Sequence, residues 1–158
     1  MIITQQTIEE FGPANANWIK WDKRFIDLAK YISTWSKDPS TKTGSVIVDK
    51  NRRVISVGYN GLSKGVEDTP ERLNNRDIKY KIIVHCERNA LLFAQRDLTG
   101  CVLYTYPFMS CATCAAMIIQ SGITRHVAPW SDNPRWVDEF ALATEIFAEA
   151  QVRVDLYK

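Results

Sequence analysis

Two short segments restrict most strongly how this chain can fold. His85 and Glu87 stand two residues apart, and Cys111 and Cys114 form a C-x-x-C pair farther along the chain. Either segment alone is weak evidence, because C-x-x-C pairs also occur in redox sites and structural zinc sites. Together they offer one imidazole and two thiolates, a ligand set that suits Zn²⁺ with one position left open. The chain is therefore expected to bring the two segments together at one point.

The cysteine pair is predicted to open a helix. The helix should run from Cys111 to about Ser121 and stop at Gly122, a residue that commonly ends helices. Cys111 and Cys114 then lie on one face of the first turn, close to unpaired backbone N–H groups. That position and a bound cation both favour thiolate over thiol.

His85 is predicted to lie at the start of another helix, which begins near Val84 and continues to Ala94. It would supply the third zinc ligand as a neutral imidazole. Glu87 is two residues from His85 and projects in a different direction. It is therefore expected to move protons at a water in the site, as a general acid and base, rather than to bind the metal.

The alternative is a closed, structural zinc site with a fourth protein ligand. His126 is the other histidine of the chain, and Cys86 or Cys101 could also serve. In a closed site Glu87 would be an unexplained carboxylate, and a chain of 158 residues can form a core without a metal. An open site is therefore favoured. His126 is expected to pack at the start of a strand. Cys86 and Cys101 are expected to be small buried residues.

The remaining pattern predicts one α/β domain over residues 1–158, with a three-layer α/β/α arrangement around a mixed five-stranded sheet. Apolar residues recur at helical steps between Trp18 and Trp35, and a last helix is expected over 134–150, capped by Asp132 or Asn133. The expected strands are 44–49, 54–59, 101–106, 125–128 and 152–156. A hairpin followed by strands with helical crossovers implies a mixed sheet with helices on both faces.

Charge and hydropathy exclude some classes of protein. The net charge of +2, from 20 basic and 18 acidic residues, lacks the dense positive surface of a dedicated nucleic-acid binder. No segment has the length of a membrane span or the pattern of a signal peptide, so a soluble, cytoplasmic protein is expected. The polar stretch 60–81 is too long for an ordinary connection, which indicates a functional or disordered segment.

The motifs around the two segments resemble the deoxycytidylate (dCMP) deaminase family, part of the zinc-dependent cytidine-deaminase-like superfamily. The resemblance covers about Phe25 to Ala128. Its motifs are Ser36–Val48, Gly58–Gly61, Lys79-Tyr80, Val84–Ala90, Gly100–Tyr104, Cys111–Ala115 and Ile118–Ile123. It implies a cytidine-deaminase-like fold, one catalytic zinc ion per subunit and hydrolysis of dCMP to dUMP and ammonia. It also implies a homo-oligomer, with a hexamer favoured, and regulation by dCTP and dTTP.

The resemblance also indicates the substrate pocket. Asn60 would contact the sugar or base, with a simple turn as the alternative. Tyr106 and Phe108 are candidates for stacking on the base, with core packing as the alternative. Ser110, where the family usually has proline, is counted among the pocket residues. Arg88 could hydrogen-bond the zinc thiolates from a second layer around the metal, or could be a solvated surface residue.

Several questions stay open at this stage. The candidates for a phosphate contact are Lys37, Lys42, Lys64, Arg72, Arg76 and Lys79, and most are expected to be solvated. Cys86 replaces the family's usual alanine and Ser63 a usual proline, so the base, for example a 5-modified cytosine, is not determined. The rival functions are a deaminase of tRNA adenosine or single-stranded DNA cytosine, and a non-catalytic zinc module.

Overall fold

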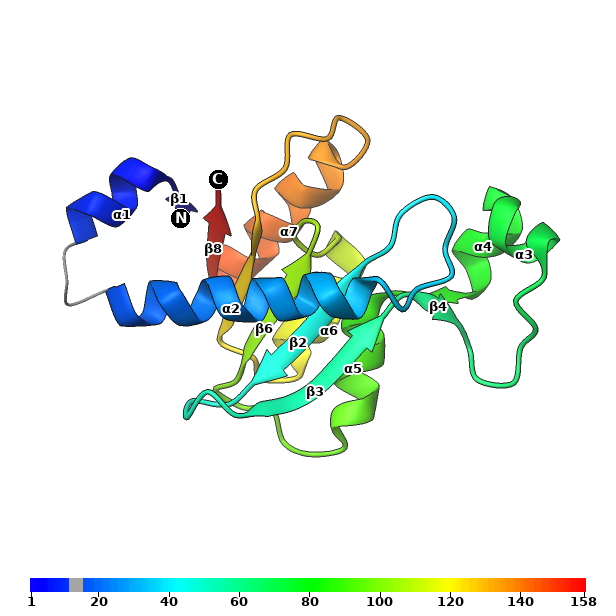
Figure 1. Cartoon of the computed structure of the whole chain (residues 1–158), viewed down its shortest axis with the longest axis horizontal. Helices are drawn as coiled ribbons and strands as arrows, with labels where there is room; N and C mark the ends of the chain where they lie inside the picture. Colours follow the sequence, from blue (N-terminus) through cyan, green and yellow to red (C-terminus); the bar gives the residue numbers. More distant parts are fainter. Residues whose placement is uncertain (12–15) are drawn as a thin grey trace.

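The computed structural model describes residues 1–11 and 16–158, and a six-stranded mixed sheet lies at its centre (Figure 1). The strand order is β1-β8-β7-β6-β2-β3. These strands are β1 (Ile2–Ile3), β2 (Gly44–Val48), β3 (Val54–Tyr59), β6 (Val102–Tyr106), β7 (Arg125–Pro129) and β8 (Arg153–Tyr157). β1, β8, β7 and β6 are parallel to one another, whereas β2 is antiparallel to both β6 and β3.

The predicted α/β fold with a mixed sheet is confirmed, but the number of strands was wrong. The sixth strand is β1, which pairs in parallel with β8 through Ile2 and Leu156. Two residues are too few to show the alternation that reveals a strand. The sheet edge therefore depends on pairing between the two ends of the chain.

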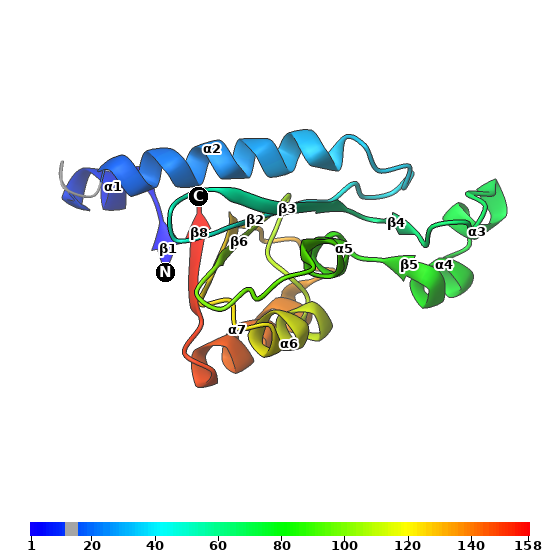
Figure 2. The same cartoon turned by 90° about the horizontal axis from the view of Figure 1, so that it is seen from below.

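Helices cover both faces of this sheet (Figure 2). α2 (Ala16–Ser33) lies on one face, and α5 (Cys86–Ala94), α6 (Ala112–Gln120) and α7 (Val137–Glu149) lie on the other. α1 (Gln5–Phe11) follows β1. None of the helices in the described residues has the length and apolar character that crossing a bilayer requires.

The segment 60–81 is structured. It contains β4 (Gly61–Leu62), α3 (Pro70–Asn74) and most of α4 (Arg76–Ile82), which project from one end of the sheet (Figure 1). β4 pairs with β5 (Ile83–Val84), so the segment is anchored at both ends. Of the two predicted alternatives, a functional or a disordered segment, the structure excludes disorder. The sequence did not reveal the helices, because short helices with polar surfaces leave no apolar period.

Two predicted helix starts also shift. Val84 belongs to β5, and α5 begins at Cys86 with His85 as its N-cap. The last helix begins at Val137, and its N-cap Trp136 makes no side-chain capping bond. The predicted cap Asn133 instead accepts a hydrogen bond from the backbone N–H of Arg135 at 3.1 Å, which forms a turn before the helix.

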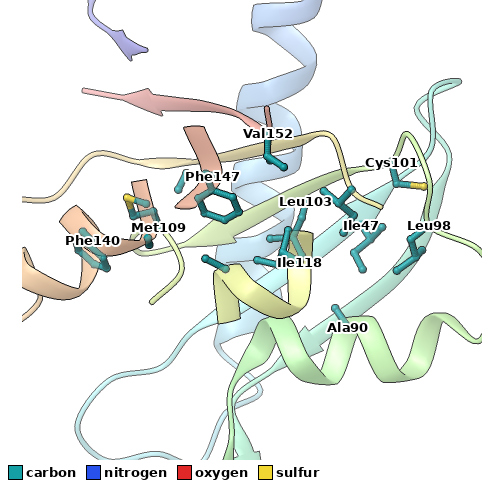
Figure 3. Packing of buried hydrophobic residues seen from close by; sticks show 14 residues of the cluster. Ile47, Ala90, Leu98, Cys101, Leu103, Met109, Ile118, Phe140, Phe147 and Val152 are labelled. Atoms are coloured by element: carbon teal, nitrogen blue, oxygen red, sulfur yellow. The ribbon is translucent and has the colours of Figure 1, made fainter. Parts of the chain in front are cut away.

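The core has one part on each face of the sheet. Ile47 and Leu103 point toward α5, α6 and α7, where they pack among residues such as Ile118 and Phe147 (Figure 3). Their neighbours in the same strands point the other way: Val46, Val48 and Tyr104 pack under α2 with Phe25 and Ala29. This alternation places the start of α5 and the start of α6 on the same side of the sheet.

A buried carboxylate ties α2 to three strands. Asp22 is 1% exposed and accepts hydrogen bonds from the hydroxyls of Tyr104 at 2.7 Å and Tyr157 at 2.5 Å. Arg125 donates to both of its oxygens, at 2.8 and 2.6 Å, and also to Asp155 at 2.7 Å. Every oxygen of the Asp22 carboxylate is therefore paired, as a buried charge requires.

His126 joins the loop before α6 to the sheet. It is fully buried in β7, and its Nε2 accepts the backbone N–H of Ser110 at 3.1 Å. The ring proton is therefore on Nδ1, which donates to the carbonyl of Leu103 at 3.2 Å. Both ring nitrogens are engaged, which excludes His126 as a zinc ligand and agrees with its predicted place in a strand.

We expect Asp22→Asn to lower the free energy of unfolding by about 3 kcal/mol, because the amide cannot accept the same four donors. This decrease is at the low end of the range for a broken buried ion pair, because Arg125 keeps its ion pair with Asp155. Urea denaturation measures it. Asp27→Asn, on an exposed position of the same helix, is the matched control. Equal free energies of unfolding for the two variants would contradict the proposed role of Asp22 in joining α2 to the sheet.

Burial lowers the pKa of His126 to about 4, so the native state keeps it neutral. Below pH 6.5 the unfolded chain binds a proton that the native state does not, which favours unfolding. The stability contribution is thus present above pH 6.5 and is lost by up to about 3 kcal/mol as the pH falls toward 4. Comparison of wild type with His126→Gln by denaturation at several pH values isolates this effect. Parallel pH profiles would refute it.

Candidate functional site

The start of α5 is held close to the sheet by a glycine. A Cβ atom on Gly58 would lie 2.2 Å from the carbonyl oxygen of Cys86 and 2.6 Å from the backbone nitrogen of Ala90. At position 58, any residue with a side chain would force α5 away from β3. Ser45 of β2 donates a hydrogen bond to the same carbonyl of Cys86 at 2.7 Å, which fixes the first turn from a second strand.

The starts of α5 and α6 converge on the predicted metal ligands. His85 is the N-cap of α5 and Cys111 the N-cap of α6, and neither side chain makes a capping bond. Nδ1 of His85 lies 3.4 Å from Sγ of Cys114 and 3.6 Å from Sγ of Cys111. One atom from each of the three residues can be chosen so that all lie within 4.8 Å of one another.

This donor set fits a zinc ion with an open position. One imidazole nitrogen and two sulfurs are ligands that zinc prefers, and three protein ligands are typical of catalytic zinc sites. Within the described residues, no further His, Cys, Asp or Glu joins the group. Cys86 and Cys101 are buried free cysteines outside it, as predicted for small core residues.

The two sulfurs are strongly coupled. The hydrogen bond from Cys114 is the largest cause that lowers the pKa of Cys111, to about 4, and the same bond raises the pKa of Cys114. The Cys111 thiolate also raises the pKa of His85. The protein alone thus holds one thiolate and one thiol beside the imidazole, and a divalent cation would displace the shared proton.

Glu87 lies beside the ligand group but is not part of it. Its side chain is buried, and Sγ of Cys86 donates a hydrogen bond to Oε2 at 3.2 Å. Burial raises the pKa of the Glu87 carboxyl, but the charge of His85 and the hydrogen bonds to the carboxylate lower it by more. The group is therefore a carboxylate near neutral pH, with one oxygen held by Cys86.

A cavity of about 410 Å³ opens over these groups, and His85, Glu87 and Cys111 form part of its wall. This volume lies in the range of small-molecule sites. Of the predicted pocket residues, Asn60, Tyr106 and Phe108 line it, and so does Arg88, which was predicted to lie in a second layer around the metal or on the surface. Ser110 is fully buried next to Cys111 and does not line the cavity. Its hydroxyl is buried without a hydrogen-bond partner among the described residues.

Asn60 uses its side chain within the protein. Its Oδ1 accepts the backbone N–H of Thr43 at 2.8 Å, and its Nδ2 donates to the carbonyl of Thr41 at 2.9 Å. The amide therefore fastens the loop that leads into β2, at the cavity wall. The sequence suggested either a turn or a substrate contact; the contact stays a prediction, because Asn60 also lines the cavity.

Aromatic side chains form another part of the wall. Phe108 packs against Trp136 and Phe140, with ring centroids 5.9 and 5.5 Å apart. Phe108 thus both packs in the core and faces the cavity. Trp136, Arg135 and Tyr80 also line the cavity, and the sequence did not assign them a role. Tyr80 is part of a family-like motif, but only the fold brings it to the segment before α7.

The candidate phosphate contacts are largely away from this cavity. Of the six cations considered, Lys79 alone lines it. Lys79 is 4% exposed and its Nζ lies 3.1 Å from Oδ1 of Asp38 and 3.3 Å from the hydroxyl of Ser40. Lys37 instead forms a surface pair with Asp68 at 2.7 Å. The buried Lys79–Asp38 pair joins α4 to the loop before β2.

Known proteins with related sequences include several deaminases. A deaminase of Aliivibrio fischeri, named for its position in the luxG 3′ region and uncharacterised, is 43% identical over 138 residues, covering 85% of this chain and 92% of the relative. Human deoxycytidylate deaminase is 34% identical over 142 residues, covering 86% of this chain and 79% of the human protein.

Solved structures show the same fold. The dCMP deaminase of cyanophage S-TIM5, in complex with dCMP and dUMP, superposes with a TM-score of 0.66 at 21% identity, covering 87% of this chain and 97% of the phage chain. In sequence, residues 19–129 match the model of the cytidine and deoxycytidylate deaminase zinc-binding region. This matched segment contains His85, Glu87 and both cysteines of the cluster, and the chain therefore belongs to the cytidine and deoxycytidylate deaminase family.

Proposed function

We propose that this protein hydrolyses dCMP to dUMP and ammonia at a zinc ion held by His85, Cys111 and Cys114. The observation that carries the proposal is the juxtaposition of this ligand group with the buried Glu87 carboxylate in one cavity. The names of the human and cyanophage relatives support dCMP as the substrate. The near-neutral charge of the chain favours a small substrate over a polynucleotide.

Zinc bound in such a site would supply Lewis acidity, which lowers the pKa of a bound water to about 7. Glu87 would accept a proton from the attacking water and deliver it to N3 of the cytosine ring as oxygen adds to C4. It would then take the second proton from the new C4 hydroxyl and deliver it to the exocyclic nitrogen, so that the C4–N bond breaks, ammonia leaves and the C4 carbonyl of uracil forms. Because Cys86 holds Oε2, Oε1 is the oxygen available to carry this proton.

The remaining pocket residues receive proposed roles from their positions. Tyr106 and Phe108 would border the base, since both line the cavity beside the ligand group. Asn60 would shape the sugar site by holding the loop at Thr41 and Thr43. Arg88 would balance the negative charge of the thiolates, because its charge acts on Cys114 and its Nε is buried without a hydrogen-bond partner among the described residues.

Three expectations of the sequence stay predictions. They are a hexameric or other homo-oligomeric assembly, regulation by dCTP and dTTP, and a cytoplasmic location. None of them is needed for the chemistry above, because all groups proposed to act on the base come from one chain.

Incubation of the zinc-loaded protein with four substrates tests the proposed function. We expect ammonia release from dCMP, and much less from dCTP, deoxycytidine and a cytosine-containing oligonucleotide. Activity on the oligonucleotide alone would replace the nucleotide proposal with a polynucleotide deaminase. Inactivity toward all four with zinc bound would favour a structural zinc module.

Glu87→Gln tests the proton carrier. The amide keeps the shape of the side chain but cannot accept the proton, so kcat should fall by about 10²- to 10⁴-fold. Zinc content, measured by atomic absorption, should stay near that of wild type. Cys114→Ser is the contrasting variant, because it should lose zinc together with activity. Activity of Glu87→Gln close to wild type would exclude Glu87 as the proton carrier.

A further inference from the structure

An exposed arginine is held at the cavity wall by two aromatic rings. The guanidinium carbon of Arg135 lies 5.1 Å from the ring centroid of Trp136 and 5.8 Å from that of Tyr80, over both rings. Nη2 also donates a hydrogen bond to the hydroxyl of Tyr80. All three residues line the cavity. Stacking on aromatic rings restrains the guanidinium and leaves most of its in-plane N–H donors available.

Among the described residues, no carboxylate forms an ion pair with Arg135. Two other cations line the cavity. Lys79 is paired with Asp38 at 3.1 Å. Arg88 directly follows Glu87 at the ligand group, and its half-buried side chain has an Nε without a hydrogen-bond partner among the described residues, so it is proposed to balance the thiolates. The acidic side chain of Glu139, which also lines the cavity, accepts the backbone N–H of Ala112 at 3.2 Å.

We propose that Arg135 binds the 5′-phosphate of the substrate and so makes the cavity selective for a nucleotide over a nucleoside. The inference rests on the proposed function and names the group that recognises the phosphate. A guanidinium presents paired N–H donors that match two oxygens of a phosphate monoester. A nucleoside lacks this phosphate, so Arg135 adds nothing to its binding affinity.

This subsite belongs to a part of the chain outside the family match. Arg135 and Trp136 follow residue 129, where the match ends, and only Tyr80 lies within it. The turn made by Asn133 sets the backbone of Arg135 directly before α7. Selectivity for the phosphate is thus assigned to the turn before the last helix rather than to the zinc-binding segment.

Arg135→Met tests the assignment, because methionine keeps an apolar stem on the rings and removes the donors. Calorimetric binding of dUMP and deoxyuridine to the zinc-loaded protein, and kcat/KM for dCMP and deoxycytidine, are the measurements. We expect dUMP affinity and kcat/KM for dCMP to fall about 10- to 100-fold. The values for both nucleosides should change less than about threefold. For Arg135→Lys, the dUMP affinity and kcat/KM for dCMP should lie between the values of wild type and those of Arg135→Met.

Arg24→Met is the matched control. Arg24 is likewise exposed and stacks on an aromatic ring, with its guanidinium carbon 4.6 Å from the centroid of Trp21, but it does not line the cavity. Its loss should leave all four constants unchanged. Thermal unfolding of both variants should match wild type, because each removes an exposed side chain.

Two outcomes would overturn the assignment: an equal loss for nucleotide and nucleoside, or no loss for either. If deoxyuridine binds too weakly to measure, competition by inorganic phosphate replaces that measurement. Inorganic phosphate should compete with dUMP for wild type but not for Arg135→Met. Failure of the proposed function is a separate result. In that case wild type would not deaminate dCMP, while the binding of dUMP would still report whether Arg135 holds a phosphate.

Discussion

The site depends on two helix starts that meet on one side of the sheet. The geometry requires α5 to lie almost in contact with β3, which Gly58 permits because it has no side chain. It also requires the loop before α6 to stay in place, and the bond from Ser110 N–H to His126 provides this. His85 and Cys111 then lie at N-cap positions, where backbone N–H groups favour negative charge.

Electrostatics at the centre follow from this arrangement. One thiolate is already favoured without a metal, because Cys114 donates to Cys111 and His85 lies beside them. Glu87 stays ionised although it is buried, since positive charge and hydrogen-bond donors outweigh the cost of burial. Cys86 adds a contact that the usual alanine could not make. In this chain the residue between histidine and glutamate therefore orients the carboxylate.

The opposite face and the cavity wall use buried ion pairs for different purposes. Asp22 joins α2 to β6, β7 and β8, so it stabilises the sheet from the side away from the site. The Lys79–Asp38 pair closes the wall of the cavity by linking α4 to the loop before β2. Arg135 is different, because it contacts the rings of Tyr80 and Trp136 and forms no ion pair with a carboxylate of the described residues. The positive charge of Arg135 therefore does not stabilise the fold through an ion pair, and it lies at the cavity wall.

The sequence by itself determined the candidate ligand group and the layers of the fold. Cys111 and Cys114 were recognisable by their C-x-x-C spacing, and His85 by Glu87 two residues later, because each pattern lies within a few residues at a predicted helix start. The nearly continuous apolar runs in β2 and β6 likewise appear within a few residues, and such runs are typical of strands buried on both faces.

Only the tertiary structure decided the interactions between distant segments. Ile2 pairs with Leu156, Asn60 binds the loop at Thr43, and Arg135 stacks on Tyr80. Asn60 and Tyr80 stand in family-like motifs, but no local pattern reveals which residue each one contacts, because each partner's local sequence is compatible with many neighbours. The candidate metal ligands are thus encoded in short local motifs, whereas the shape of the pocket around them arises from packing across the whole fold.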